Sequence, residues 1–462
     1  MSCMYGMRFQ KTTNQTGFKC QTPAAYWQVK EWQLSHHVLE FTPVNKRVTS
    51  LHLRVRDRSL TVVSAYGPNM SAVYPAFLES LGGVQDSAPT GHSVVLVGDF
   101  NAHVGNDSLR PKHTDVVFLK THKTASSTMQ NILFRFAERH NLTVALPNYG
   151  GQFSYPYLFQ RSSVHPHTLP PNIITNHMRF NKKELEKLMP PGSVYITTMR
   201  DTSSMFESLF VYCYTGSEAF HRVPNRSLGA FLENPFKYYH PKEKYSMLAR
   251  NCLTYDLGGN KDNTSIDYAR QLAAEVEKTF SLVMISNYFD ESLILLRYLL
   301  NWDLEDIIYF KSNMRSEKAK KKVTPELSAK IRAWNSIDDY LFEHFNASLW
   351  RQLNAIGLDC VAREVQLLRK AQQKLMKTCF GEEAPRLKSA SKMKNNILKP
   401  WLPGNVEIMG YELVQNLTAD ARRLCTKLTM PELQYSNAML KAQSKRYLKE
   451  HAKDHRGQRL KT

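Results

Sequence analysis

One segment of the chain constrains its fold more than any other, because it predicts a buried strand, a basic loop and a helix in succession. The strand is the apolar run at residues 116–119, and apolar residues recur at helical spacing from residue 129 to residue 137. Lysine, serine and threonine dominate the loop at 120–128, which contains no glycine. Since a helix N-terminus presents unpaired N–H groups, this loop predicts a phosphate-binding site. It lacks the Gly-x-x-x-x-Gly-Lys-Ser/Thr spacing of ordinary nucleotide hydrolases.

A second strand and helix repeat this plan further along the chain. Residues 193–199 predict a buried strand, Arg200 follows it directly, and residues 206–212 predict a helix that contains Ser208. An arginine at a strand end, with a serine about two helical turns later, can bind a separate phosphate. Two phosphate sites suit a nucleotide that is phosphorylated at both ends. This arrangement points to the sulfuryl donor 3′-phosphoadenosine-5′-phosphosulfate (PAPS).

From about residue 115 to residue 435 the chain resembles the galactose-3-O-sulfotransferase family. The segments that carry the resemblance are 118–128 (FLKTHKTASST), 175–181 (TNHMRFN), 199–208 (MRDTSSMFES), 288–296 (YFDESLILL), 333–350 (AWNSIDDYLFEHFNASLW) and 430–435 (MPELQY). The resemblance implies an α/β, P-loop-like sulfotransferase fold with a central parallel sheet flanked by helices. It also implies transfer of the sulfuryl group of PAPS to the 3-hydroxyl of terminal β-galactose, on glycoprotein glycans or on glycolipids such as galactosylceramide. Residues 136–147 look closest to the glycoprotein-acting branch.

The resemblance assigns roles to single residues of the first loop and of the His-Met-Arg segment. Lys123 stands where the family has its loop lysine, and would bind the donor and stabilise charge on the leaving phosphate. His177 would accept the proton of the sugar hydroxyl. Around Lys123, the 5′-phosphate would be bound by Thr124, Ala125, Ser126, Ser127 and Thr128. The plainer alternatives are a surface lysine, hydroxyl residues that only cap a helix, and a structural histidine.

The resemblance also assigns the second phosphate site and, more weakly, contacts to the acceptor. Arg200 and Ser208 would bind the 3′-phosphate, although Thr202 stands where related chains usually have proline. The alternative is an ion pair of Arg200 with a neighbouring carboxylate, Asp201 or Glu207. The candidates for acceptor contact are His122 and Arg179, the latter two residues beyond His177 and so on the same face of a strand. Sulfuryl transfer of this type requires no metal, and the sequence shows no metal-ligand spacing.

The first hundred residues have a different character. Residues 60–68 and 94–103 predict two strands, and the second strand leads into Gly98-Asp99-Phe100-Asn101. Residues 38–112 resemble part of the endonuclease domain of a non-LTR retroelement, in the exonuclease–endonuclease–phosphatase superfamily, which would place Asp99 and Asn101 in a phosphodiester site. The family's upstream glutamate and C-terminal histidine motifs have no counterpart here, so we expect an inactive fragment. Residues 1–37 remain unassigned.

The composition and net charge of the chain are compatible with more than one cellular location and more than one kind of binding partner. The formal net charge is +20, with lysine clusters at 318–322 and in the tail at 436–462, for which we expect disorder. The alternatives to an active enzyme are a nucleic-acid-binding protein that uses the N-terminal fragment and the basic tail, or an inactive transposon-derived chimera. The family resemblance implies a Golgi membrane protein with a lumenal catalytic domain, but no signal anchor is visible. The seven cysteines indicate no particular disulfide pairing. In the part that resembles a sulfotransferase, glycosylation sequons occur at Asn141, Asn225, Asn263, Asn346 and Asn416.

Overall fold

The chain divides into two units, Met1–Pro111 and Lys112–Thr462, in a computed structural model. In the first unit the structure describes six strands and residue 111. In the second it describes residues 112–316, 323–402 and 406–459, with side chains as far as residue 452. The lysine cluster at 318–322 lies outside the described residues. The division falls close to the boundary expected from the change in sequence character.

The first unit contains two sheets. One is the antiparallel pair of β1 (Arg8–Gln10) and β2 (Lys19–Gln21). The other has the strand order β3-β4-β5-β6, in which β3 to β5 are antiparallel and β6 is parallel to β5; the bounds are β3 (Val38–Asn45), β4 (Val48–Val55), β5 (Arg58–Ala65) and β6 (Ser93–Val97). β5 and β6 confirm the two strands expected from the sequence. Asp99 and Asn101 lie outside the described residues, so the remnant phosphodiester site stays a prediction.

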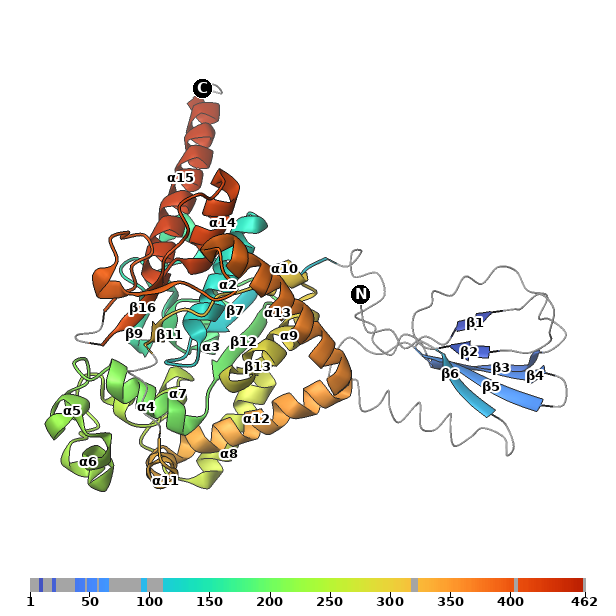
Figure 1. Cartoon of the computed structure of the whole chain (residues 1–462), viewed down its shortest axis with the longest axis horizontal. Coiled ribbons are helices and arrows are strands. Elements are labelled where there is room, and N and C mark those ends of the chain that lie inside the picture. Colours follow the sequence, from blue (N-terminus) through green and yellow to red (C-terminus); the bar gives the residue numbers. More distant parts are fainter. Residues whose placement is uncertain are drawn as a thin grey trace. The chain divides into compact units, whose positions relative to one another are not determined.

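The second unit is built on a five-stranded parallel sheet, as the sequence predicts (Figure 1). Its strand order is β13-β12-β7-β10-β8, with bounds β7 (Val116–Leu119), β8 (Val144–Ala145), β10 (Ile173–Ile174), β12 (Val194–Met199) and β13 (Leu282–Ile285). All four side chains of β7 are buried, because this strand lies in the middle of a sheet covered on both faces. Parallel strands end at one edge of a sheet, so Lys120 after β7 and Arg200 after β12 lie at the same edge.

Helices flank this sheet, and two small sheets lie beside it. The helices are α2 (Ser126–Arg139), α3 (Lys182–Glu186), α4 (Thr202–Tyr212), α5 (Glu218–His221), α6 (Leu228–Glu233), α7 (Cys252–Asp256), α8 (Ile266–Thr279), α9 (Phe289–Leu300), α10 (Leu304–Ile307), α11 (Pro325–Trp334), α12 (Ser336–Ile356), α13 (Leu358–Phe380), α14 (Ala419–Thr429) and α15 (Glu432–Arg459). β9 (Gln152–Leu158) pairs in parallel with β11 (His177–Arg179). β14 (Met314–Arg315) and β15 (Leu387–Ser389) pair antiparallel with β16 (Ile408–Tyr411).

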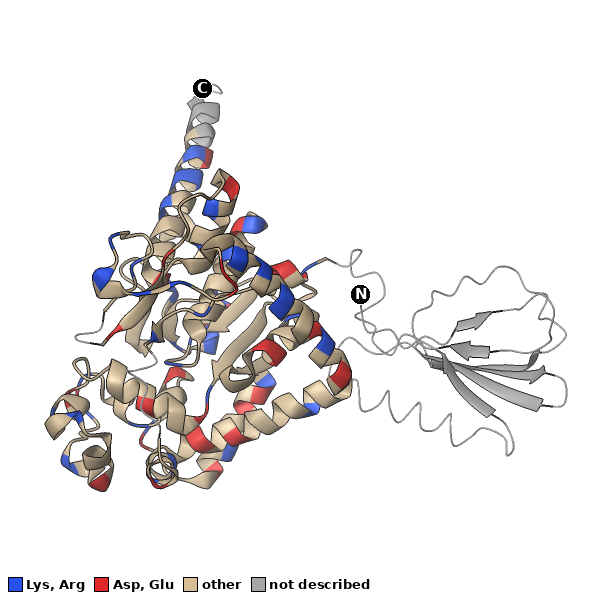
Figure 2. Ribbon diagram, viewed as in Figure 1, with Lys and Arg blue, Asp and Glu red and all other residues tan. Residues whose placement is uncertain are grey.

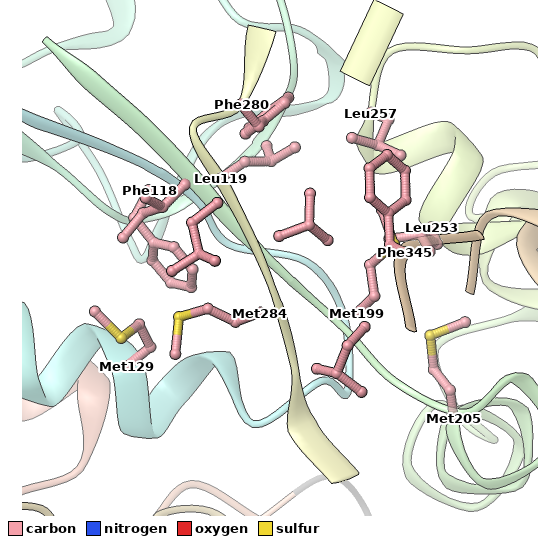
Figure 3. Packing of buried hydrophobic residues seen from close by; sticks show 14 of the residues in the cluster. Phe118, Leu119, Met129, Met199, Met205, Leu253, Leu257, Phe280, Met284 and Phe345 are labelled. Carbon is pink, nitrogen blue, oxygen red and sulfur yellow. The ribbon is translucent and has the colours of Figure 1, made fainter. Parts of the chain in front are cut away.

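The core lies between the sheet and these helices. Phe118 and Leu119 of β7, Met129 of α2 and Met284 of β13 are fully buried in one cluster (Figure 3). α9 packs against both β13 and α13. Burying one such side chain contributes about 1.5–3 kcal/mol, so this cluster fixes the positions from which the loops after β7 and β12 begin.

The C-terminal residues differ from the expectation of a disordered tail. Residues 436–459 continue α15, although the helix is rich in lysine and arginine (Figure 2). Tyr435, Met439 and Gln443 are four residues apart and all buried, so they form one helix face that packs on the domain. The Gln443 side chain both donates to the Val144 carbonyl (3.0 Å) and accepts from the Val144 N–H (2.7 Å) at edge strand β8. These contacts stabilise a helix that composition alone does not predict.

A disulfide joins Cys379 at the end of α13 to Cys425 in α14. This pair is one of the combinations that the sequence leaves open. Cys213 and Cys252 are free thiols. Among the described residues, every helix is too short or too polar to cross a lipid bilayer.

Candidate active site

The loop between β7 and α2 has the shape of an anion cradle. Lys123 (φ 59°) and Ala125 (φ 64°) both adopt the left-handed conformation, and Ala125 caps the start of α2. Each left-handed non-glycine residue costs about 1–2 kcal/mol, so the packed surroundings must hold the loop in this form. Left-handed residues beside a helix start bring successive N–H groups into a concave arrangement that binds anions. A loop without glycine therefore has a backbone geometry that suits anion binding, and phosphate binding by this loop stays a prediction.

Most hydroxyl groups of the loop are engaged with the protein itself. The Thr124 hydroxyl bonds those of Thr121 (2.7 Å) and Thr198 (2.8 Å), which ties the loop to the end of β12. Ser126 donates to the Thr121 carbonyl (2.6 Å). Thr128 accepts from the backbone N–H of residue 312 (3.0 Å). These three side chains are buried and shape the loop, but they do not cap the helix as the alternative proposes, because α2 begins without a side-chain cap.

Ser127 differs from its neighbours because it faces a cavity. Its hydroxyl donates to the carboxylate of Glu432 at 2.6 Å, and it lines the cavity together with Tyr212, Trp401 and Tyr411. The carboxylate and the aromatic rings come from segments far from the loop in sequence. Of the loop hydroxyls predicted to contact phosphate, that of Ser127 is therefore the one best placed to do so.

Lys123 lies over an aromatic ring next to this cavity. Its Nζ is 3.5 Å from the centre of the Tyr212 ring, at the end of α4. Burial lowers the pKa of Lys123 to about 7, and the guanidinium groups of Arg315 and Arg200 act in the same direction. The neighbouring cations disfavour the ammonium form of Lys123. An anion bound at this place would offset their charge and so favour the ammonium form. The alternative of a plain surface lysine does not describe this environment.

Arg200 is held at the junction of β12 and α4. Its Nε donates to the hydroxyl of Ser204 (3.0 Å), and its Nη1 donates to the carbonyl of Lys123 (3.1 Å). Ser208, one turn beyond Ser204, is buried in α4. Within the described residues, Ser204 rather than Ser208 is thus the hydroxyl that contacts Arg200.

The two carboxylates beside Arg200 in sequence have other partners. Asp201 accepts from Arg332 (2.6 Å), and Glu207 pairs through both oxygens with Arg315. The alternative of a surface ion pair between Arg200 and one of these carboxylates is therefore not what the structure shows. Burial lowers the pKa of Arg200, as expected for a guanidinium held in a place of low dielectric. Such a group is suited to an anionic ligand.

His177 lies at the start of β11, directly beside the loop. Its Nδ1–H donates to the Lys120 carbonyl (2.9 Å), so Nε2 is the nitrogen with a lone pair. The ammonium of Lys120 is 3.0 Å from this Nε2. Burial holds the pKa of His177 well below its usual range, and Lys120 and His122 add to the effect. The site therefore contains a neutral imidazole that can accept a proton.

His122 stacks on His177 with ring centres 4.4 Å apart. Its Nδ1 bonds the Asp256 carboxylate (2.9 Å), which also accepts from the His122 backbone N–H (2.9 Å) and the Tyr155 hydroxyl (2.9 Å). The thiol of Cys252 lies near this pair, but hydrogen bonds already join the imidazole and the carboxylate, so we do not assign them as metal ligands. His122 is thus fixed in orientation beside the proposed base.

Arg179, the other weak candidate, lies further along β11. Its guanidinium covers the Tyr255 ring at 4.0 Å and donates to the carbonyl groups of Gly258 (3.3 Å) and Gly259 (3.1 Å). It lines a second, open cavity with residues 258–262. The contacts described for Arg179 are thus with Tyr255 and the Gly258–Gly259 backbone, and none of them is with His177.

Three charged groups of the site were not predicted from the sequence. They are Lys120, which the motif contains but to which no role was given, Asp256 and Glu432. Glu432 lies in the motif Met-Pro-Glu-Leu-Gln-Tyr, which is part of the family resemblance. Membership of that motif is the one sequence signal that could have drawn attention to it.

Taken together, the edge of the sheet combines cations at two strand ends with a neutral imidazole. Lys123 and Arg200 are suited to a nucleotide that is phosphorylated at both ends, since buried cations favour phosphate groups. His177 can remove a proton from a hydroxyl. These are the two requirements for moving an anionic group from a phosphorylated nucleotide to an alcohol.

Comparison with known proteins agrees with this chemistry. A family model described as galactose-3-O-sulfotransferase matches residues 73–443. Human galactose-3-O-sulfotransferase 3 is 50% identical over 348 residues, which cover 74% of this chain and 80% of the human protein. Bovine galactosylceramide sulfotransferase is 40% identical over 326 residues (70% of this chain, 77% of the bovine protein). Mouse galactose-3-O-sulfotransferase 2 is 37% identical over 367 residues (76% of this chain, 91% of the mouse protein).

The family match begins at residue 73, inside the segment 38–112 that resembles an endonuclease fragment. The endonuclease resemblance thus stays a prediction.

Proposed function

The chain belongs to the galactose-3-O-sulfotransferase family, and we propose that it transfers the sulfuryl group of PAPS to the 3-hydroxyl of terminal β-galactose. The observation that carries this proposal is the position of a neutral His177 imidazole beside a glycine-free anion cradle at the sheet edge. PAPS supplies the sulfuryl group and a phosphate leaving group. The residues of the chain bind it, orient the acceptor and take up the proton.

We assign the donor's 5′-phosphosulfate to the loop after β7. The N–H groups at the start of α2 and the Ser127 hydroxyl would bind its oxygens, and the Lys123 ammonium would neutralise charge on the leaving oxygen. Thr124, Ser126 and Thr128 would support this loop from behind, because their hydroxyls are bonded within the protein. Ala125 would contribute its backbone.

We assign the donor's 3′-phosphate to Arg200. The hydroxyl beside it is that of Ser204, where the sequence predicts Ser208. The guanidinium is already oriented by its bonds to Ser204 and to the Lys123 carbonyl, so the two phosphate sites are mechanically joined. Binding at one site would hence favour the geometry of the other.

Replacing Arg200 with alanine should raise the KM for PAPS by roughly 10- to 100-fold, because hydrogen bonds to a charged partner contribute about 1.5–3 kcal/mol. Initial rates at varied PAPS concentration measure this. Arg222→Ala removes an exposed arginine that pairs with Glu243 and is the matched control. An unchanged KM in Arg200→Ala would contradict the assignment of the 3′-phosphate.

For the acceptor, we propose terminal β-galactose on glycoprotein glycans as the first choice and galactosylceramide as the second. The identity to galactose-3-O-sulfotransferase 3 (50%) exceeds that to galactosylceramide sulfotransferase (40%), which supports this order. His122 would contact the sugar beside His177. Arg179 and the open cavity at residues 258–262 would receive the part of the glycan beyond galactose.

The test of this function is direct. The purified full chain is incubated with PAPS and a panel of β-galactosides, including galactosylceramide and N-glycans with terminal galactose, and the product is located by mass spectrometry and NMR. We expect sulfate on the galactose 3-hydroxyl. Bound PAPS without transfer to any galactoside would favour the inactive chimera, and tight binding of DNA without PAPS binding would favour the nucleic-acid alternative.

We propose that the catalytic domain works in the Golgi lumen, as the family resemblance implies. Support comes from the Cys379–Cys425 disulfide, since disulfides persist in oxidising compartments.

Lumenal location also predicts which sequons become glycosylated. Asn225 and Asn416 are exposed, whereas Asn346 is half-buried within α12. In a cell line that secretes the chain behind a cleaved leader, glycan should therefore be found at Asn225 and Asn416 and not at Asn346. Site mapping by mass spectrometry after glycosidase treatment measures this. In the Asn225→Gln and Asn416→Gln variants, loss of one glycan should increase the mobility of the secreted chain on a gel. A secreted chain with bare Asn225 and Asn416 would contradict the prediction.

A further inference from the structure

The contact between Lys120 and His177 has no role in the reaction as described so far. Lys120 follows β7 directly, and its side chain is only 3% exposed. Its ammonium lies 3.0 Å from His177 Nε2, the nitrogen that must accept the acceptor's proton. The same lysine offers its backbone carbonyl to the Nδ1–H of that imidazole (2.9 Å). One residue thus contacts both nitrogens of the proposed base.

Both contacts have chemical consequences for the imidazole. The bond to the carbonyl selects the tautomer in which Nδ1 holds the proton. The ammonium donates to the lone pair of Nε2, and its positive charge opposes a second proton on the ring. Lys120 therefore fixes the tautomer through its backbone and the protonation state through its side chain.

Glu432 holds the Lys120 ammonium in this place. Its carboxylate is 3.1 Å from Lys120 Nζ and 2.6 Å from the Ser127 hydroxyl. Burial alone would raise the pKa of Glu432, but Lys120 and Ser127 outweigh burial and leave this pKa below its usual value. The first residue of α15 is thus ionised, and it connects the ammonium to the loop that binds the donor.

We propose that Lys120, held by Glu432, is a positioning residue of this enzyme: it keeps Nε2 of His177 unprotonated and directed at the place of the acceptor hydroxyl. The proposal rests on the proposed function, in which His177 is the base. When the acceptor hydroxyl arrives, its O–H donates to Nε2 in place of Lys120, and the displaced ammonium is free to donate to the same oxygen. The proton moves from the hydroxyl to Nε2 while the oxygen forms its bond to sulfur and the phosphate leaves.

Other titratable and charged groups also lie around His177 and influence its protonation. His122 stacks on the ring from the loop, with Asp256 of α7 and Tyr155 of β9 behind it. Lys123 is a further cation of the loop that disfavours protonation. Among these groups, Lys120 is the one whose charged atom touches Nε2. Its removal should therefore change the titration of His177 more than the removal of Lys123.

The experiment titrates His177 in the full chain by NMR of the imidazole, assigned by comparison with His177→Gln. Lys120→Met should let His177 bind its proton at higher pH than in the wild type. Glu432→Gln keeps the lysine but removes the negative charge that offsets the ammonium. The midpoint of the His177 titration should therefore move to lower pH than in the wild type. Lys427→Met removes a similar lysine–glutamate pair, with Glu138, away from the site, and serves as the control.

Activity gives the second measurement. In Lys120→Met the acid limb of kcat/KM should move to higher pH, so that the ratio of rates at about pH 5.5 and about pH 7.5 falls roughly tenfold. Lys120→Arg, which retains a cation, should restore most of this ratio. A His177 midpoint that stays unchanged in Lys120→Met and in Glu432→Gln would overturn the proposal, even if activity were lost. Since the titration needs no turnover, absence of transfer by the wild-type chain would instead overturn the proposed function.

Discussion

Replacing Lys123 with alanine is expected to lower the rate of sulfuryl transfer by about 10²–10³-fold, the largest effect we expect from any residue of the donor site. Negative charge grows on the phosphate oxygen as the sulfuryl group leaves, and a preorganised cation stabilises that charge more in the transition state than in the bound donor. The measurement is kcat with saturating PAPS and β-galactoside. Because Thr124, Ser126 and Thr128 hold the loop independently of the Lys123 side chain, the variant should fold normally.

The low pKa of Lys123, about 7 because of burial, adds a pH dependence to this prediction. The ammonium is present below this pKa and is lost as the pH rises through it, so PAPS should bind the wild type more weakly above about pH 7. Lys123→Arg keeps its charge and should show a flatter dependence. Isothermal titration at several pH values measures both, with the exposed Lys187→Ala as control. A full rate in Lys123→Ala, or pH dependence of PAPS binding that persists in it, would contradict the assignment.

The fold was predictable where the sequence has continuous apolar runs. Residues 116–119 and 194–199 contain few polar side chains, and such runs fit only strands that are covered on both faces of a parallel sheet. The helix that follows each strand showed its own spacing of apolar residues. C-terminal residues 436–459 gave no comparable signal, because Met439 and Gln443, which continue the buried face begun by Tyr435, lie among many lysines.

For the loop of the candidate site, the sequence predicts which hydrogen-bond donors are present, but not how the backbone and the side chains are arranged. Its composition indicates anion binding, yet it does not show that the hydroxyls of Thr124, Ser126 and Thr128 turn into the protein while Ser127 faces the cavity. Left-handed backbone at Lys123 and Ala125 also has no local signature, because glycine is the residue by which such positions are usually recognised.

The partners that tune the site come from distant parts of the chain. Asp256 is 134 residues from His122, and Glu432 is 305 residues from Ser127. In a sequence, an isolated aspartate or glutamate so far from the loop cannot be distinguished from an acidic residue of the surface. Only tertiary packing brings these carboxylates to the edge of the sheet. The sequence therefore predicts the cations near the strand ends and the candidate base, but not the charged groups that pack around them.

Replacing His177 with alanine should lower kcat by about 10²–10⁴-fold, the usual contribution of a general base, and leave the KM for PAPS nearly unchanged. Burial, Lys120 and His122 hold the pKa of His177 well below its usual range, so the imidazole of the proposed base should stay neutral at pH values that protonate a free histidine. On the acid side, activity of the wild type should fall only when the pH drops through this lowered pKa of His177. The Ala variant should lack that acid limb. Steady-state kinetics across pH measure both effects, with the half-buried His344→Ala, outside the site, as control.

A loss of activity alone would not separate proton transfer from support of the loop, because the His177 ring also bonds the Lys120 carbonyl. Added imidazole makes this distinction: it can occupy the space left in His177→Ala and accept the proton, whereas it cannot replace a covalent link between β11 and the loop. We therefore expect free imidazole to restore part of the rate, and rescue by substituted imidazoles to increase with their basicity. If PAPS affinity falls together with kcat and imidazole has no effect, His177 supports the loop, and the proton acceptor must be sought in its stacked neighbour His122 with Asp256.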